Sequence, residues 1–286
     1  MLRRLFTLAL LAALPAPAVA MPPMWVVRDA DSEIVLFGSV HVLPPDLNWR
    51  PPALAAALAR ADDLWFEIPF DAATQARFGG LARDHGLQPP GRRLSSQLSP
   101  RGRARLRTVC ARLGLSETAI EGLRPWLAEV QISLAALARY EAGAANGVEQ
   151  KISAAAPSTA RREAFETPEQ QIAMFADAPA AEQIASLEQT LRDVDTDPES
   201  YQRLLDAWMS GDPRKIEKEG LTPLRHASPA LYRRLVTERN ARWVQTIAQR
   251  MNGSGSTVMV VGAGHLAGPD GVPARLRALG FKVEGP

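Results

Sequence analysis

Cysteine is almost absent from this sequence, which contains only Cys110. One cysteine excludes an intramolecular disulfide and a zinc cluster built on several thiolates. The core must therefore supply the stability of the fold, and any bound metal must be held by histidine and carboxylate side chains. A surplus of charge is also lacking: the formal net charge is +2 at pH 7, which does not favour a nucleic-acid partner.

Long hydrophobic runs are missing as well. The N-terminal apolar run covers residues 5–14, follows two arginines, and precedes the small residues 18–20. It is shorter than the roughly 20 residues that span a bilayer, and its flanks are those of a secretory signal peptide. We therefore predict a signal peptide over residues 1–20 with cleavage near Ala20, a periplasmic or secreted location, and no stable membrane insertion.

Both ends of the mature chain show strand and helix signals in turn. Short apolar runs bounded by turn residues indicate strands, and proline or glycine marks the helix ends. The N-terminal end predicts a hairpin, a helix and a third strand, and the C-terminal end predicts helix, strand, helix and strand. The predicted ranges are 24–27, 33–37, 51–61 and 64–68, and then 231–251, 258–261, 271–279 and 281–283.

The middle of the chain is predicted to be mostly helical, because proline is tolerated in the first turn of a helix and recurs there at helix-like intervals. The predicted first-turn residues are Pro100, Pro125, Pro168, Pro198 and Pro229. We therefore predict one α/β domain over residues 21–286. It would have a central mixed, largely parallel sheet with flanking helices and a helical insertion at about 95–230.

Two of the four histidines occur in the same motif, Gly-x-x-His, and each directly follows a predicted strand. Gly38 leads to His41 after the second strand, and Gly262 leads to His265 after the strand at 258–261. Glycine at a strand exit lets the backbone turn sharply. Because the carboxyl ends of parallel strands meet at one edge of a sheet, we expect the two imidazoles to face a shared crevice.

A third strand end contributes Glu67, a carboxylate that follows the apolar residues 64–66 and needs a polar partner there. Two histidines and a carboxylate resemble an open metal site, in which a bound water becomes acidic enough to attack a substrate. The alternative is that His41 and His265 are turn residues whose rings bond to nearby backbone carbonyls. We predict His41, His265 and Glu67 as metal ligands.

Three further polar residues are candidates for the site. Glu166 ends a short predicted strand, and the capping box directly after it explains its neighbours but not Glu166 itself. Arg239 and Asn240 lie on the buried stripe of the predicted C-terminal helix, so both need polar partners. Arg239 fits either a carboxylate of the site or of a substrate, or a structural ion pair. We predict Glu67, Glu166, Arg239 and Asn240 as candidate catalytic residues.

These residues resemble the pattern of the TraB/GumN family, which includes the Tiki proteases. The matching pieces are Leu36 to His41, Ala61 and Asp62 with Glu67, Arg124 to Trp126, Phe165 to Thr167 with Gln170 and Gln171, Glu238 to Asn240, and Val261 to Gly268. The sequence departs from that pattern with Phe165 where Leu is usual and Ser39 where Thr is usual. Neither change touches a candidate ligand.

The resemblance implies a fold similar to the erythromycin-esterase and haem-binding ChaN groups. It also implies a metal-dependent protease site that His41, Glu67 and His265 match directly, with manganese or cobalt as the ion and zinc as an alternative. The resulting hypothesis is an exported metal-dependent hydrolase, a peptidase acting on short peptides or a protein substrate. The alternative is a non-catalytic periplasmic protein of the same fold that binds a metal ion or haem. Ester hydrolysis follows from the fold resemblance alone.

Overall fold

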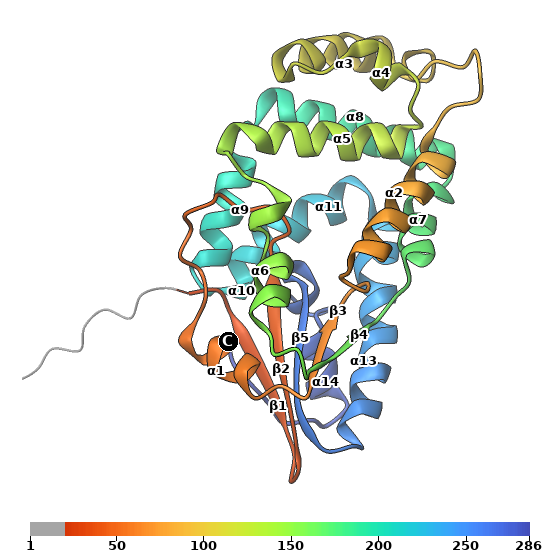
Figure 1. The fold of residues 1–286 in the computed structure, drawn as a ribbon. Coiled ribbons are helices and arrows are strands. Elements are labelled where there is room, and N and C mark those ends of the chain that lie inside the picture. The colour runs from red at the N-terminus through yellow and green to blue at the C-terminus, as the bar shows by residue number, and fades with distance from the viewer. Residues whose placement is uncertain (1–20) are drawn as a thin grey trace, which may run out of the picture.

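The computed structural model describes residues 21–286, so the predicted signal peptide lies outside the described residues. Six strands form one sheet in the spatial order β4-β3-β5-β2-β1-β6 (Figure 1). The strands are β1 (Met24–Arg28), β2 (Ser32–Ser39), β3 (Asp63–Phe66), β4 (Arg161–Ala164), β5 (Gly255–Gly262) and β6 (Val283–Glu284). The middle residues of β2 and β5 are buried on both faces of the sheet, which explains their unbroken apolar runs.

Most neighbouring strands are parallel. β4, β3, β5 and β2 pair in parallel, whereas β1 pairs antiparallel with both β2 and β6. The predicted mixed, largely parallel sheet is confirmed, including the hairpin of β1 and β2. The predicted connection from β2 to β3 exists, but β5, from the other end of the chain, lies between them. Ser39 is therefore paired with Gly262, and the two Gly-x-x-His loops leave the sheet side by side.

Helices cover both faces of the sheet and the edge at which the parallel strands end. The α-helices are α1 (Pro52–Ala59), α2 (Ala72–Gly86), α3 (Pro100–Leu113), α4 (Glu117–Glu121), α5 (Pro125–Leu137), α6 (Val148–Ala155), α7 (Pro168–Ala176), α8 (Ala180–Thr196), α9 (Ser200–Met209), α10 (Pro213–Ile216), α11 (Thr222–Ala227), α12 (Pro229–Tyr232), α13 (Glu238–Met251) and α14 (Val272–Ala278). In Figure 1 the stacked helices α3, α5 and α8 stand beyond the carboxyl ends of the strands.

Three hydrophobic cores hold these layers together. Alternate residues of β2 point to opposite faces of the sheet. Val35 and Phe37 belong to the core with α1 and α9, whereas Ile34 and Leu36 belong to the core with α13 and α14. A third core lies among α3, α5, α7 and α8. Part of the helical middle of the chain, α3, α5, α7 and α8, is therefore a layer with its own core, whereas α6, α9 and α10 pack in the core with the sheet.

Proline marks the helix starts as predicted, except that the helix after Pro198 begins two residues later, at Ser200. The predicted range 231–251 is wrong in detail, because the helical segment begins at Pro229 and a π-helical turn, Arg233–Thr237, separates α12 from α13. Among residues 21–286, no helix has the length and apolar character needed to cross a membrane.

Candidate functional site

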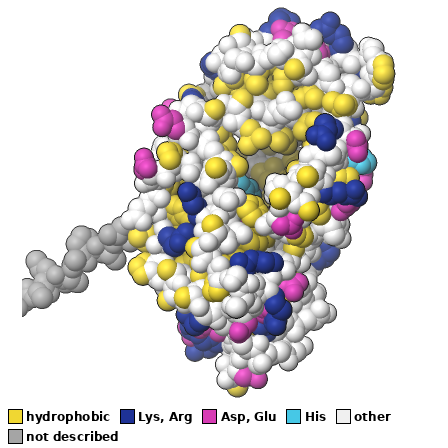
Figure 2. All heavy atoms as spheres, viewed as in Figure 1, with side chains coloured by type: hydrophobic (Ala, Val, Ile, Leu, Met, Phe, Trp, Pro, Cys, Tyr) yellow, Lys and Arg dark blue, Asp and Glu magenta, His cyan; other side chains and the backbone are white. Residues whose placement is uncertain are grey.

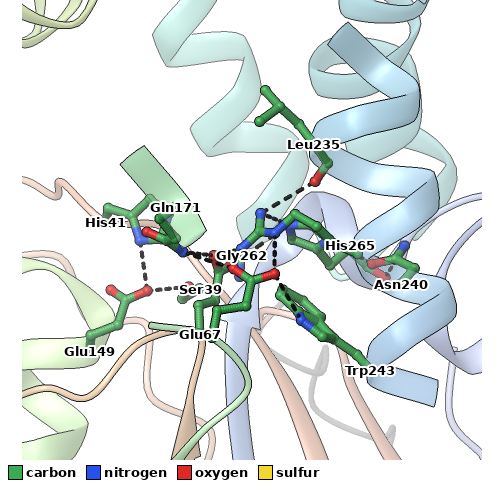
Figure 3. A network of polar contacts seen from close by, with 12 residues as sticks. Ser39, His41, Glu67, Glu149, Gln171, Leu235, Asn240, Trp243, Gly262 and His265 are labelled. Atoms are coloured by element: carbon green, nitrogen blue, oxygen red, sulfur yellow. Dashed lines mark hydrogen bonds and ion pairs between the residues drawn. The ribbon is translucent and has the colours of Figure 1, made fainter. Parts of the chain in front are cut away.

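The two Gly-x-x-His loops face one opening at the sheet edge (Figure 3). His41 follows β2 in an open loop, and its side chain is 64% exposed. His265 lies in the 3-10 helix η6 (Ala263–Leu266) and is buried against the ring of Trp243. Glu67, just after β3, lies with Gly262 between the two histidines. The structure thus brings the three residues predicted as metal ligands to one place.

Glu149 fixes the ring of His41. Its Oε1 accepts a hydrogen bond from Ser39 Oγ and lies 2.7 Å from His41 Nδ1. The negative charge of Glu149 raises the pKa of His41 above its ordinary value. Glu149 lies in the first turn of α6, where the N–H of Val148 donates to the carbonyl of Val40 at 3.1 Å. The start of this helix is therefore docked beside the His41 loop.

Sequence reasoning did not find Glu149. An acidic residue in the first turn of a helix is common, because it interacts favourably with the helix dipole, so its position gives no sign of a site. The residue that permits the contact is Gly147, at which a Cβ would collide with the carbonyl oxygen of His41. A glycine before a helix is a weak signal, and it does not reveal which segment approaches it.

Glu67 is the carboxylate that faces the opening. Its Oε1 accepts a hydrogen bond from the N–H of Gly262 at 2.7 Å, and its Oε2 accepts from Gln171 Nε2 at 3.1 Å and Arg239 Nη2 at 2.5 Å. Burial opposes ionisation of this side chain, but the positive charges of Arg239 and His41 and the hydrogen bond from Gly262 outweigh it. The pKa of Glu67 therefore lies below its ordinary value, and the carboxylate is ionised at neutral pH.

Arg239 joins the two carboxylates to His265. Its Nε and Nη2 donate to the two oxygens of Glu166, each at 2.8 Å, and Nη2 also donates to Glu67. Its Nη1 donates to the carbonyl of Leu235 at 3.3 Å and lies 2.9 Å from His265 Nε2. Every nitrogen of the guanidinium has a partner within the chain. Of the roles left open by the sequence, the observed one is an ion pair with the site carboxylates.

Asn240 sets the protonation of His265. Arg239 only donates, so Nε2 of His265 accepts, and the ring hydrogen lies on Nδ1, which donates to Asn240 Oδ1 at 2.6 Å. The amide nitrogen of Asn240 donates to the backbone oxygen of Asp270 at 2.8 Å. Burial lowers the pKa of His265 to about 3, and the charge of Arg239 acts in the same direction. His265 is therefore neutral near pH 7.

Two cavities meet at this site. One of about 700 Å³ and one of about 410 Å³ share His41, Glu67 and Gln171 in their walls. A Cβ at Gly262 would lie 3.2 Å from Glu67 Oε1, 3.6 Å from His265 Cδ2 and 3.8 Å from His41 Nε2. The glycine therefore keeps the space between these groups open. Figure 2 shows hydrophobic side chains around a hollow on this face of the molecule.

Glu166 and Asn240 lie behind the opening. Both are buried, and Glu166 accepts a further hydrogen bond from Trp243 Nε1 at 3.1 Å. Neither residue lines the two cavities that meet at His41, whereas Glu67 lines both and Arg239 lines the smaller one. Of the four residues predicted as catalytic, Glu67 and Arg239 thus line a cavity, and Glu166 and Asn240 are hydrogen-bonded behind it.

The donor types at this junction fit a divalent ion. Each imidazole has its Nδ1 beside an oxygen, as metal-binding histidines usually do, and Glu67 supplies a carboxylate. Within residues 21–286, however, no three histidine, cysteine or carboxylate side chains are gathered around one point. Arg239 contributes to this, because its Nη1 occupies the lone pair on Nε2 of His265. Ligation by His265 would require this hydrogen bond to give way.

The fold and the site define an α/β protein with a polar site at the carboxyl edge of a largely parallel sheet, built from two Gly-x-x-His loops and overlaid by a helical layer. A comparison with protein families matches residues 23–285 to the TraB/PrgY/gumN family, and the chain belongs to this family. The match spans all the pieces that carried the resemblance. Comparison with curated proteins and with solved structures gave no match.

Proposed function

We propose that the protein is an exported hydrolase that cleaves amide bonds of short peptides with the help of a divalent metal ion. The observation that carries this proposal is the convergence of His41 Nε2, Glu67 and His265 on the space beside Gly262. The two cavities share His41 and Glu67 in their walls, and the smaller one also includes Gly262 and His265. A peptide can therefore be held on both sides of the bond that is cleaved.

Each reacting group has its orientation set by a partner. Glu149 holds Nδ1 of His41, so that Nε2 is directed toward the opening, and Asn240 holds Nδ1 of His265. Glu67 is held by the N–H of Gly262. Because Glu67 lines both cavities and Glu166 lines neither, we assign the carboxylate at the reacting centre to Glu67.

His41, His265 and Glu67 would hold the ion, with manganese or cobalt preferred from the family resemblance and zinc as the alternative. When bound, such an ion supplies a water of lowered pKa and polarises the carbonyl of the substrate. Arg239 is kept beside Glu67 by its two hydrogen bonds to the carboxylate of Glu166. Its positive charge therefore lies close to the place where negative charge develops on the carbonyl oxygen.

The test measures two properties of the mature protein and of its variants His41→Ala and His265→Ala. The first is bound metal, and the second is cleavage of a peptide library with and without Mn²⁺. The matched controls are His85→Ala on α2 and His226→Ala on α11, two exposed histidines that do not line the paired cavities. We expect cleavage that a chelator abolishes and that only the two site variants lose. Cleavage that survives both site substitutions contradicts the proposal.

One observation favours a second candidate function, ligand binding without turnover. The larger cavity has apolar side chains along one wall and opens beside the imidazole of His41, whose Nδ1 is held by a carboxylate. This combination suits haem: the apolar wall would contact the ring, and His41 would be the axial ligand of the iron. Haem bound through His41 gives a Soret band that His41→Ala abolishes. Metal that is retained without any cleavage also supports the binding function.

A further inference from the structure

The larger of the two cavities has an aromatic wall. Its lining includes His41 and Glu67, and three phenylalanines: Phe66 at the end of β3, Phe70 in the segment that follows, and Phe78 on α2. The ring centroids of Phe66 and Phe70 are 5.4 Å apart. Phe66 belongs to a core of the sheet, and Phe78 packs against the core of the helical layer. This wall is therefore anchored in two cores and keeps its shape.

Few charged groups line this cavity. Besides His41, Glu67 and Glu149, its lining includes Asp71, whose carboxylate caps α2 by accepting a hydrogen bond from the N–H of Thr74 at 2.7 Å. The other polar lining groups there are neutral, and Gln75, Gln150 and Ser153 offer amide and hydroxyl groups to a peptide backbone. The cavity thus combines an apolar wall with a few neutral hydrogen-bonding groups, as ligand pockets commonly do.

We propose that this cavity takes a bulky apolar side chain, aromatic or branched aliphatic, from the residue next to the cleaved bond. The inference rests on the proposed peptidase function and names its substrate class. Burial of apolar surface drives the selection, while a charged side chain would lose its hydration against three phenyl rings. Glu67 and Glu149 at the mouth are already paired with Arg239 and His41, so they do not require a basic substrate.

The experiment compares peptides that differ only in the residue on one side of the cleaved bond: Phe, Leu, Ala, Asp or Lys. For the metal-loaded protein, we expect kcat/KM for the Phe and Leu peptides to exceed that for the Ala, Asp and Lys peptides by about tenfold or more. The side of the bond that shows this preference is the side that occupies the cavity. Rates equal within about twofold across the series would overturn the inference.

A filling substitution links the preference to this cavity. Ala145, in the 3-10 helix η3 (Ala144–Asn146), is exposed and lines the cavity, so Ala145→Trp places an indole in it without disturbing a core. The matched control is Ala104→Trp on an exposed position of α3. We expect Ala145→Trp to lower kcat/KM for the Phe peptide about tenfold while the Ala peptide changes about twofold or less. A control variant with the same loss would contradict the assignment.

A binding measurement separates this inference from the proposed function. N-acetyl-phenylalanine amide and N-acetyl-alanine amide are titrated into the wild-type protein and Ala145→Trp and followed by NMR. If no peptide is cleaved, tighter binding of the Phe amide that Ala145→Trp weakens supports the pocket while the peptidase proposal fails. Equal binding of the two amides in that case overturns the pocket. If peptides are cleaved, the rate comparison decides, and cleavage without preference leaves only the peptidase proposal standing.

Discussion

The two Gly-x-x-His loops begin alike and end in opposite environments. His41 stands in an open loop against one carboxylate, with its side chain 64% exposed. His265 is buried, with one ring nitrogen on Asn240, the other beside Arg239, and its ring 4.4 Å from that of Trp243. The same short motif thus yields one imidazole that is largely exposed and one that is largely buried.

The difference arises outside the motif. The loop after β5 turns into a 3-10 helix, and two consecutive residues of α13 engage the imidazole of His265 within it. The loop after β2 borders both cavities, and the imidazole of His41 pairs with Glu149 in the first turn of α6. In the closed half of the site, around His265, the imidazole is buried and hydrogen-bonded, and in the open half, around His41, the imidazole is exposed beside the cavities. Substitutions confined to one half test this division.

The largest effect on stability is expected in the closed half, from Arg239→Met. The change leaves Glu67 and Glu166 buried without their cation, and removing one partner of a buried ion pair costs about 3–5 kcal/mol. Urea unfolding measures the loss. The control is Arg242→Met on the same helix, whose side chain is 61% exposed and lies 3.8 Å from Glu166, with an expected cost of at most about 1 kcal/mol. Equal losses of unfolding free energy in the two variants would contradict the view that Arg239 forms a buried ion pair on which the closed half depends.

A second effect in the closed half depends on pH. The unfolded chain protonates His265 with an ordinary pKa of 6.5, whereas the folded protein resists protonation until pH falls to about 3. Protons therefore favour the unfolded state between these values, and stability falls as pH decreases. From pH 7 to pH 5 this residue costs roughly 2 kcal/mol. We expect His265→Gln to remove that part of the pH dependence in urea unfolding.

The control for this dependence of the unfolding free energy on pH is His85→Gln, because His85 is exposed on α2. It should unfold with the wild-type pH dependence. The ionised carboxylate of Glu67 contributes little to this slope, because its pKa is lowered in the folded protein and its contribution is lost mainly as pH falls below the ordinary glutamate pKa of 4.5. A slope that persists in His265→Gln would show that His265 is not held neutral by burial.

A smaller effect is expected in the open half, from Glu149→Gln. The change removes the charge that raises the pKa of His41 to about 9, and we expect that pKa to fall toward 6.5. NMR titration of the imidazole measures it. Because His41 is largely exposed, the loss of stability should be no more than about 1 kcal/mol. Glu163→Gln, in the exposed part of β4, is the control. An unchanged titration of His41 would contradict its pairing with Glu149.

Much of the fold could be predicted from local patterns. The apolar runs of β2 and β5 predicted buried strands because both faces of these strands are covered, and proline predicted helix starts because it fits the first turn. The position of β5 between β2 and β3 could not be predicted, since strand order depends on pairing between distant parts of the chain. The π-helical turn at Arg233–Thr237 could not be predicted either, because no pattern in the sequence indicates it.

The site was predictable where one element decides the geometry. Helical spacing alone indicated that Arg239 and Asn240 point inward, because neighbours three and four residues away are buried. Glu149 was not predictable, because its contact with His41 joins residues 108 positions apart in the chain. The roles of these residues in catalysis or metal binding stay predictions until they are measured.

The smallest change in stability, and the sharpest test of the comparison, is expected from Gly262→Ala. Gly262 belongs to the closed half, yet a methyl group there would stand 3.2 Å from Glu67 Oε1 and 3.8 Å from His41 Nε2. The neighbours need shift only by a few tenths of an ångström, so the cost in stability should stay within about 1 kcal/mol. Because the methyl group fills the junction, we expect peptide cleavage to fall roughly 10- to 100-fold.

Gly264→Ala is the matched control, since it lies in the same loop but its added methyl group meets the side chain of Leu221, whose Cδ2 would lie 2.9 Å away. NMR of the imidazole resonances separates the two variants even without turnover, because only Gly262→Ala should shift those of His41. If Gly264→Ala perturbs His41 equally, the loop transmits the change as a whole and the two halves are not independent. If neither variant does so, the two histidines do not share the space at Gly262, and the proposed reacting centre lacks its basis.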